Sequence, residues 1–223
     1  MFSGAEGRET VFSEKLASLE AWYADPDNPV NAKMDLALSR ITGGESCLDI
    51  GCRTGEALLR LQRLAKFRTL FGIDIDPENV EYCRRKVAHA TNIFVSVGDA
   101  LELGFGANSF DCVTVLDVLE HIRNPRLVLC EVERAAKRGG QVVLSVPGPY
   151  DLLYSRLLRL NRGEHKVALF PQQWFRLVQN AGFRVNSYVL LRFPLSRALS
   201  LSRFWFVQRI FVTWTMILFA QKR

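Results

Sequence analysis

The sequence predicts an α/β protein with an open, doubly wound sheet. The first observation is a turn unit at 46–61, where a short apolar run breaks at two glycines and a helical pattern follows. The second is that further apolar runs of strand length alternate with helical patterns up to residue 147. In open α/β sheets such a unit presents backbone N–H groups and a helix N-terminus to a ligand. We therefore expect a ligand site at the carboxyl ends of the strands.

The size and composition are those of one ordinary globular domain. A chain of 223 residues can bury a full hydrophobic core, so we expect a single domain over 1–223. We divide it into N-terminal helices at 1–45, a ligand-binding core at 46–147, and cap or insert segments at 148–170 and 192–210. Five cysteines without a CxxC pair favour reduced, buried thiols. With no secretory signal pattern at the N-terminus, this predicts a cytoplasmic protein.

Charge is distributed unevenly along the chain. Residues 147–223 contain 12 Lys and Arg against Asp151 and Glu164, a net charge of +10, which leaves −4 of the overall +6 for residues 1–146. The basic part is also rich in aromatic residues. This asymmetry indicates an anionic partner such as a membrane surface or nucleic acid, or else a solvated basic face without a partner.

The turn at 49–55 is the most informative stretch. A dinucleotide fingerprint needs glycines at positions 1, 3 and 6, but counting from Gly51 gives Arg53 and Glu56, and the Gly-Lys-Ser/Thr of a P-loop is absent. Asp49-Ile50-Gly51-Cys52-Arg53-Thr54-Gly55 instead resembles the first motif of the class I S-adenosyl-L-methionine (SAM)-dependent methyltransferases, with Arg53 in place of the middle glycine. The resemblance places five residues around the cofactor: Asp49, Gly51, Cys52, Arg53 and Gly55. Cys52 could equally be a small packing residue beside the turn.

The next two predicted strands end in acidic residues. Asp74 follows an apolar run and lies 25 residues after Asp49, close to the spacing of a βαβ unit. A carboxylate there can accept hydrogen bonds from both ribose hydroxyls of a nucleoside, because its two oxygens lie side by side. The alternative is that Asp74 only caps the next helix. By the resemblance, Ile75 also borders the cofactor, and Asp99 and Ala100 after the strand at 92–97 contact its adenine.

The fourth predicted strand, 110–116, leads into a second distinctive motif. Phe110-Asp111-Cys112-Val113 and Leu119-Glu120-His121-Ile122 resemble the "F-D-x-V … L-E-H-I" signature of the ubiquinone-biosynthesis-like, or type 11, subgroup. The resemblance places Leu116 beside the cofactor. It also makes Asp117 and His121 candidates for hydrogen bonding or acid–base catalysis near the transferred methyl group. The alternative is that Glu120 and His121 only fix the local loop and helix start.

Four motifs in the expected order over 46–147 strengthen the resemblance. It implies a Rossmann-like, doubly wound sheet of seven strands, mostly parallel with an antiparallel last strand. We expect a helix at 126–137 that ends at Arg138-Gly139-Gly140, and a fifth strand at 141–147. Helices before the first strand would cover one side of the cofactor pocket, where Trp22 and Tyr23 either line it or pack against the sheet.

The C-terminal third shows a different pattern. We expect an Arg-bearing helix at 150–160, a helix at 172–180 and a strand at 183–191. His165 between them is a candidate general base, or else a hydrogen-bonding partner of its loop. The apolar stretch 204–220 is too short and too polar for a membrane span, which needs about 20 apolar residues. We therefore assign 211–221 to the antiparallel strand and 192–210 to an insert.

The resemblance implies a SAM-dependent methyltransferase, and the apolar, Arg-bearing cap segments favour a small, hydrophobic or amphipathic acceptor, with oxygen, nitrogen or carbon as the methylated atom. The alternative is a non-catalytic SAM-binding protein that docks on a membrane or a partner. Peripheral contact with an anionic membrane, at its inner surface, fits the basic aromatic segments. Nucleic acid is disfavoured because the basic residues are interleaved with large aliphatic ones. No His/Cys/Asp cluster has the spacing of a metal site, so no metal requirement is predicted.

Overall fold

The computed structural model describes residues 17–18, 20–25, 28–148, 165–167, 169–194 and 212–223. Within these residues the chain forms a seven-stranded sheet with the order β3-β2-β1-β4-β5-β7-β6. Its strands are β1 (Gly44–Ile50), β2 (Phe67–Asp74), β3 (Ile93–Val97), β4 (Phe110–Leu116), β5 (Ala136–Pro147), β6 (Phe183–Pro194) and β7 (Val212–Lys222). The first five strands are parallel, and β7 pairs antiparallel with both β5 and β6. The predicted seven-stranded, doubly wound sheet is therefore confirmed.

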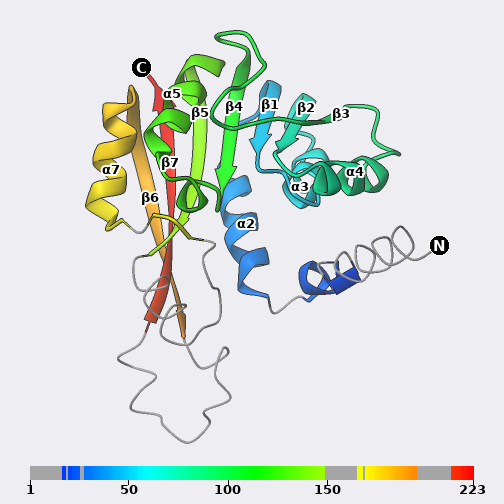
Figure 1. The fold of residues 1–223 in the computed structure, drawn as a ribbon, viewed down its shortest axis with the longest axis horizontal. Helices are drawn as coiled ribbons and strands as arrows, with labels where there is room; N and C mark the ends of the chain where they lie inside the picture. Colours follow the sequence, from blue (N-terminus) through cyan, green and yellow to red (C-terminus); the bar gives the residue numbers. More distant parts are fainter. Residues whose placement is uncertain (1–16, 19, 26–27, 149–164, 168, 195–211) are drawn as a thin grey trace, which may run out of the picture.

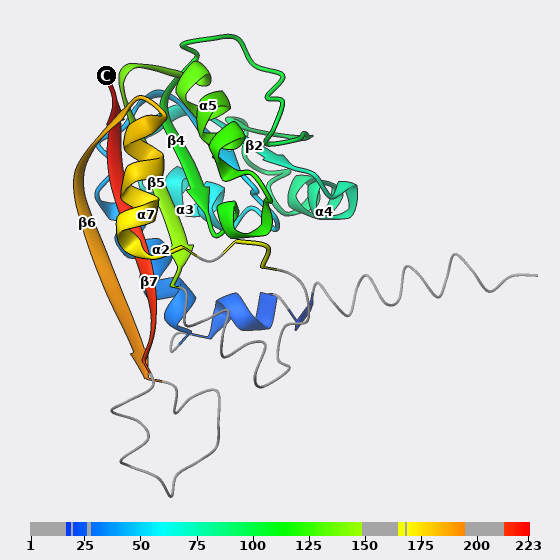
Figure 2. The same ribbon diagram turned by 60° about the vertical axis from the view of Figure 1, so that its left-hand side comes forward.

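Helices cover both faces of the sheet. They are α2 (Pro29–Ser39), α3 (Glu56–Arg63), α4 (Pro77–Lys86), the 3-10 helix η1 (Leu119–His121), α5 (Pro125–Ala135) and α7 (Pro171–Asn180). Figure 2 shows α5 and α7 in front of the sheet and α2 and α3 behind it. Neighbouring residues of a strand point to opposite faces. Leu48 therefore belongs to the buried cluster that includes Leu129 of α5, whereas Cys47 belongs to the cluster that includes Leu38 of α2 and Leu58 of α3.

The parallel strands point the same way, so their carboxyl ends meet at one edge (Figure 1). The segments that leave β1, β2, β3 and β4 there are the turn before α3, the turn before α4, the loop after residue 97 and η1. All the predicted cofactor-binding residues lie on or next to these strand ends. The described residues contain no helix that is long and apolar enough to cross a membrane.

Several predicted boundaries need correction. The helix expected at 126–137 ends at Ala135, and β5 begins at Ala136 rather than at 141, because residue 136 pairs with Phe110 of β4. Lys137, expected in the last helical turn, instead donates hydrogen bonds of 2.8 and 2.9 Å to the two carboxylate oxygens of Asp111. This long-range contact overrides the local helical pattern. The expected buried state of the cysteine thiols also fails for Cys130, which is exposed on α5.

The C-terminal strands agree with expectation except in length. The expected strand at 211–221 is β7, whereas β6 continues three residues beyond 191 to Pro194 and pairs there with residues 212–214. Those three residues were expected in the insert. The remainder of the insert, most of the cap segment at 148–170 and the helix expected at 150–160 lie outside the described residues.

Candidate functional site

The turn between β1 and α3 depends on left-handed backbone conformations. Gly51 and Gly55 have φ angles of 75° and 77°, and Arg53 between them has a φ of 47°. A Cβ atom on Gly51 would lie 2.4 Å from Cγ2 of Val118, and one on Gly55 would lie 2.5 Å from Sγ of Cys83. Glycine is therefore required at both ends of the turn, for its backbone conformation and for close packing. Arg53 also adopts the left-handed conformation, which favours glycine.

Backbone donors tie this turn to the neighbouring strand. The N–H groups of Gly51 and Cys52 both donate to the carbonyl of Ile73 on β2, at 2.8 and 2.9 Å. The next N–H, that of Arg53, donates to Oδ2 of Asp74 at 2.9 Å. Three successive peptide groups are thus fixed by the end of β2, so the turn is rigid before any ligand binds.

Asp74 connects two turns at once. Its Oδ1 accepts a hydrogen bond of 3.0 Å from the N–H of Asp76, which caps α4 by accepting from the N–H of Glu78 at 2.9 Å. The predicted capping role of Asp76 is confirmed. Asp74 itself is 8% exposed and does not cap the helix in that way. Its carboxylate fixes the β1–α3 turn on one side and the β2–α4 turn on the other.

Asp49, at the end of β1, is a buried carboxyl group. It is 3% exposed, and the hydroxyl of Thr114 on β4 donates to its Oδ1 at 2.6 Å. Burial raises the pKa of Asp49 to about 7; the Thr114 hydrogen bond lowers it and the nearby charge of Asp74 raises it. Asp49 therefore changes charge near neutral pH in the wall of the cavity described next.

Two cavities open along the carboxyl edge of the sheet and share Gly51, Arg53 and Asp117 as lining residues. The larger has a volume of about 760 Å³ and is lined by the predicted residues Asp74, Ile75, Asp99, Ala100 and His121. The smaller has a volume of about 140 Å³ and is lined by the predicted residues Asp49, Cys52 and Leu116. Gly55 lines neither cavity and acts through the shape of the turn. The cavities together gather nearly all of the predicted cofactor residues.

The rim of the larger cavity is unusually apolar. Ile75 is 69% exposed and Leu101 is 41% exposed, although both are large aliphatic side chains. Asp99 lines the same cavity, and its Oδ1 accepts from the N–H of Leu101 at 2.8 Å. Exposed apolar side chains beside a fixed carboxylate suit a flat, partly polar ring such as a purine.

The smaller cavity is closed by residues ahead of β1. Trp22 and Tyr23 line it, and Tyr23 also packs against the buried cluster on this face of the sheet, so it has both of the roles considered for it. Lys33 of α2 also lines it; this lysine is 7% exposed and forms an ion pair with Oδ2 of Asp117. Sequence reasoning missed Lys33, because a lysine within a helical pattern is usually on the solvent face. The sequence contains no signal that would have placed it inside.

Asp117 lies where the two cavities meet. Its backbone has a φ of 55°, and its Oδ1 accepts from the hydroxyl of Ser145 at 2.8 Å while Lys33 binds the other oxygen. A non-glycine residue in this conformation costs free energy that surrounding contacts must offset. The Asp117 carboxylate is thus fixed by Ser145 and paired with Lys33, at the point predicted to face the transferred methyl group.

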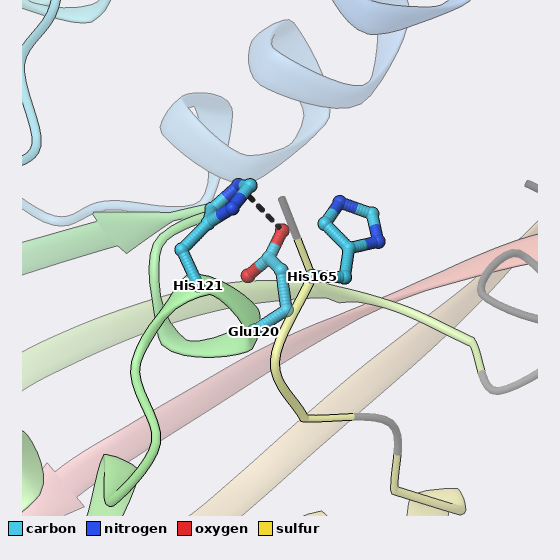
Figure 3. A group of neighbouring side chains, drawn as sticks. All are labelled: Glu120, His121 and His165. Carbon is cyan, nitrogen blue, oxygen red and sulfur yellow. Dashed lines mark ion pairs between the residues drawn. The ribbon is translucent and has the colours of Figure 1, made fainter. Parts of the chain in front are cut away.

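The two histidine candidates meet at a buried glutamate (Figure 3). Nε2 of His121 lies 3.9 Å from Oε1 of Glu120, and the rings of His121 and His165 are 4.9 Å apart between centroids. Glu120 is 2% exposed. Its carbonyl accepts from the N–H groups of Lys166 and Val167 at 2.7 and 3.0 Å, which brings the segment of His165 against η1. Sequence reasoning treated the two histidines separately and did not foresee this juxtaposition.

Comparisons with known proteins agree with this geometry. The family model described as "Methyltransferase domain" matches residues 48–144, which span β1 to β5. A demethylmenaquinone methyltransferase of Staphylococcus aureus (strain JH9) is 35% identical over 101 residues, which cover 45% of this chain and 42% of that protein. Over β1 to β5 the chain is therefore similar to a methyltransferase domain, and this similarity covers less than half of its length.

Other matches are broader but less specific. An uncharacterized 37.1 kDa protein in transposon TN4556 of Streptomyces fradiae is 32% identical over 156 residues, which cover 66% of this chain and 45% of that protein. The chain thus spans less than half the length of these curated relatives. The solved structure of YcgJ from Bacillus subtilis matches with a TM-score of 0.71 at 18% identity, over 86% of this chain and 99% of that one. The cyclase SpnF matches with a TM-score of 0.66 at 19% identity, over 86% and 80%. These two structures show the fold alone.

Proposed function

We propose that the protein transfers a methyl group from SAM to a small hydrophobic or amphipathic acceptor. The observation that carries the proposal is the pair of adjoining cavities at the carboxyl edge of the sheet, with Asp49, Asp74 and Asp99 placed along them. The residues present fit the cofactor. A carboxylate at the end of β2 suits ribose hydroxyls, and the exposed Ile75 and Leu101 suit the faces of adenine.

The smaller cavity is proposed to bind the charged amino acid part of SAM. Asp49 would face its ammonium group, and Lys33 and Arg53 supply positive charge for its carboxylate. When bound, SAM supplies the methyl group together with a good leaving group, so the protein acts mainly by proximity and alignment. Asp117, which lines both cavities, and His121, which lines the larger one, are the side chains proposed to orient the acceptor.

The nature of the acceptor is supported by composition and by one relative. The basic, aromatic-rich part of the sequence at 147–223 favours an apolar or amphipathic partner over a small charged metabolite. A curated relative is named demethylmenaquinone methyltransferase, which points in the same direction. We extend the proposal to a cytoplasmic protein in peripheral contact with the inner surface of an anionic membrane, where such acceptors reside.

A second candidate is a SAM-binding protein that does not transfer methyl groups. Arg53 favours it, because an arginine with a φ of 47° stands where the family has glycine. The structural match to a cyclase also indicates that this fold serves other reactions. The three carboxylates along the cavities favour SAM binding under either candidate.

Transfer of a labelled methyl group separates the two candidates. Purified protein is incubated with methyl-labelled SAM and cell extract that has been fractionated into aqueous and organic-soluble parts, with Asp74→Ala as the matched control. We expect label in an organic-soluble product with the wild-type protein only. Saturable SAM binding without label in any fraction would favour the non-catalytic candidate, and label confined to aqueous products would contradict the apolar acceptor.

Liposome flotation tests the proposed membrane contact separately. We expect the full chain to float with vesicles that contain anionic lipid and to remain at the bottom of the gradient with neutral vesicles. The difference should shrink as salt is raised, because surface electrostatic attraction is screened. Equal flotation with both kinds of vesicle would contradict the anionic preference.

A further inference from the structure

Two of the three histidines of the chain gather around a buried carboxylate. The ligand atoms offered by Glu120, His121 and His165 all lie within 4.8 Å of one another. In Figure 3 the Glu120 carboxylate lies between the two imidazole rings. A buried charge is stable in a protein when it is paired or when it coordinates a metal ion. The cluster therefore has the donor groups and the burial of a cation site.

The backbone, rather than the side chains alone, produces this convergence. Glu120 and His121 are adjacent in η1, directly after β4. His165 comes from a segment 44 residues beyond His121, and the N–H groups of Lys166 and Val167 fix that segment to the carbonyl of Glu120. Two short, hydrogen-bonded segments thus deliver three donor groups to one point. The arrangement resembles a site that is formed before its ligand arrives.

We propose that Glu120, His121 and His165 bind one divalent transition-metal ion. Two imidazole nitrogens and one carboxylate oxygen suit zinc, iron, manganese or cobalt, whereas magnesium and calcium prefer ligand sets made of oxygen. Metal–nitrogen bonds of about 2.1 Å require the donor atoms to approach to about 3.5 Å from one another. The side chain of His121 is 40% exposed, so it can rotate toward the ion without repacking the core.

Three protein ligands leave coordination positions open, as in catalytic rather than structural metal sites. His121 also lines the larger cavity, so an ion held by these residues would border the space where the acceptor is expected. This role rests on the proposed function. A hydroxyl oxygen of the acceptor bound to the ion would have a lowered pKa and release its proton to water. Its oxygen–carbon bond would then form as the sulfur–carbon bond of SAM breaks.

Cobalt titration tests the site directly. The full chain is freed of metal by chelation and titrated with Co²⁺ in the absence of SAM, with visible absorption as the readout, followed by competition with Zn²⁺ or Mg²⁺. We expect saturation at one equivalent, displacement by Zn²⁺ and no displacement by Mg²⁺ at the same concentration. Absorption that rises without saturation, or equal displacement by both ions, would overturn the proposal.

Three variants assign the ligands. Glu120→Gln and His165→Ala should each weaken Co²⁺ binding at least tenfold, whereas His89→Ala, which removes the exposed third histidine, should leave it unchanged. His165 is only half-buried, so its variant tests the site even if loss of the buried Glu120 impairs folding. Unchanged affinity in folded His165→Ala would overturn the assignment.

Failure of this proposal and failure of the proposed function can be distinguished. Cobalt binding is read without SAM, and SAM binding is read separately in chelator-treated protein. Methyl transfer at full rate in the presence of chelator would overturn the proposed role of the metal and leave the methyltransferase proposal intact. Cobalt binding by a chain that does not bind SAM would support the metal site but overturn its proposed role in methyl transfer.

Discussion

The β1–α3 turn and the Glu120–His121–His165 cluster lie at the same edge of the sheet but are built in different ways. The turn is fixed by its own backbone, because three successive N–H groups donate hydrogen bonds to Ile73 and Asp74 of the neighbouring strand. The cluster is formed by side chains from segments far apart in sequence. Changes in the turn should therefore affect folding and cofactor binding together. Changes at His165 should affect only the binding of an ion.

The largest expected effect comes from adding one methyl group to the turn. Gly51→Ala would force alanine into a φ of 75° and place its Cβ 2.4 Å from Val118. The left-handed conformation alone costs about 1–2 kcal/mol, and the overlap adds to it. We expect the free energy of unfolding in urea to fall by about 3 kcal/mol and SAM affinity to fall more than tenfold.

Gly104→Ala is the matched control for this substitution. A Cβ on Gly104 meets no atom within 4 Å. Its unfolding free energy should stay within about 0.5 kcal/mol of the wild-type value. Equal behaviour of the two variants would show that the turn does not require glycine and would remove the basis of the comparison.

The pH dependence of stability gives an intermediate effect. The pKa of Asp49 is about 7 in the folded protein and 3.8 for the free side chain, so the folded state holds the proton more tightly. The stability that this proton contributes is fully present below pH 4 and is lost as the pH rises through 7. Between pH 5 and 7.5 this group should lower the free energy of unfolding by about 2 kcal/mol.

Asp49→Asn isolates that contribution, because its amide does not titrate and can still bind the Thr114 hydroxyl. Urea unfolding of both proteins at the two pH values gives the difference. The stability of the wild-type protein relative to the variant should decrease toward pH 7.5. A constant difference would show that Asp49 does not titrate in this range.

The smallest effect is expected at the residue that departs from the family motif. Arg53→Gly removes an unfavourable φ of 47° but gives the unfolded chain more freedom, so the two contributions oppose each other. We expect a change in unfolding free energy within about 1 kcal/mol and a modest change in SAM affinity, measured by calorimetry. Complete loss of SAM binding would instead show that the arginine itself binds the cofactor.

Local features of the fold could be predicted from the sequence. The cap at Asp76, Pro77 at the start of α4 and the glycine turn follow from short-range rules, and the seven strands were expected at their places along the chain. The end of α5 could not be predicted, because Lys137 is drawn away by Asp111 on another strand. For the same reason the burial of Lys33 against Asp117 has no local signal.

The candidate site likewise has one part that could be predicted from the sequence and one part that could not. The residues that line the two cavities come mostly from the ends of consecutive strands, and parallel topology brings such ends together. The cluster depends on the segment of His165, 45 residues after Glu120, returning to contact it, and no spacing rule predicts such a contact. The expectation of no metal requirement rested on sequence spacing alone, and the cobalt titration tests it.

Calorimetric titration of SAM into the purified chain tests the central claim most directly, with Asp74→Ala and Asp76→Ala as a matched pair. Both remove a carboxylate beside the β2–α4 turn, but only Asp74 lines the larger cavity. Asp76→Ala should cost about 1 kcal/mol of stability through loss of the helix cap and keep its SAM affinity. We predict saturable binding to one site in the wild-type protein, weakened at least tenfold in Asp74→Ala. Absence of saturable SAM binding by the folded wild-type chain would contradict the proposed cofactor site.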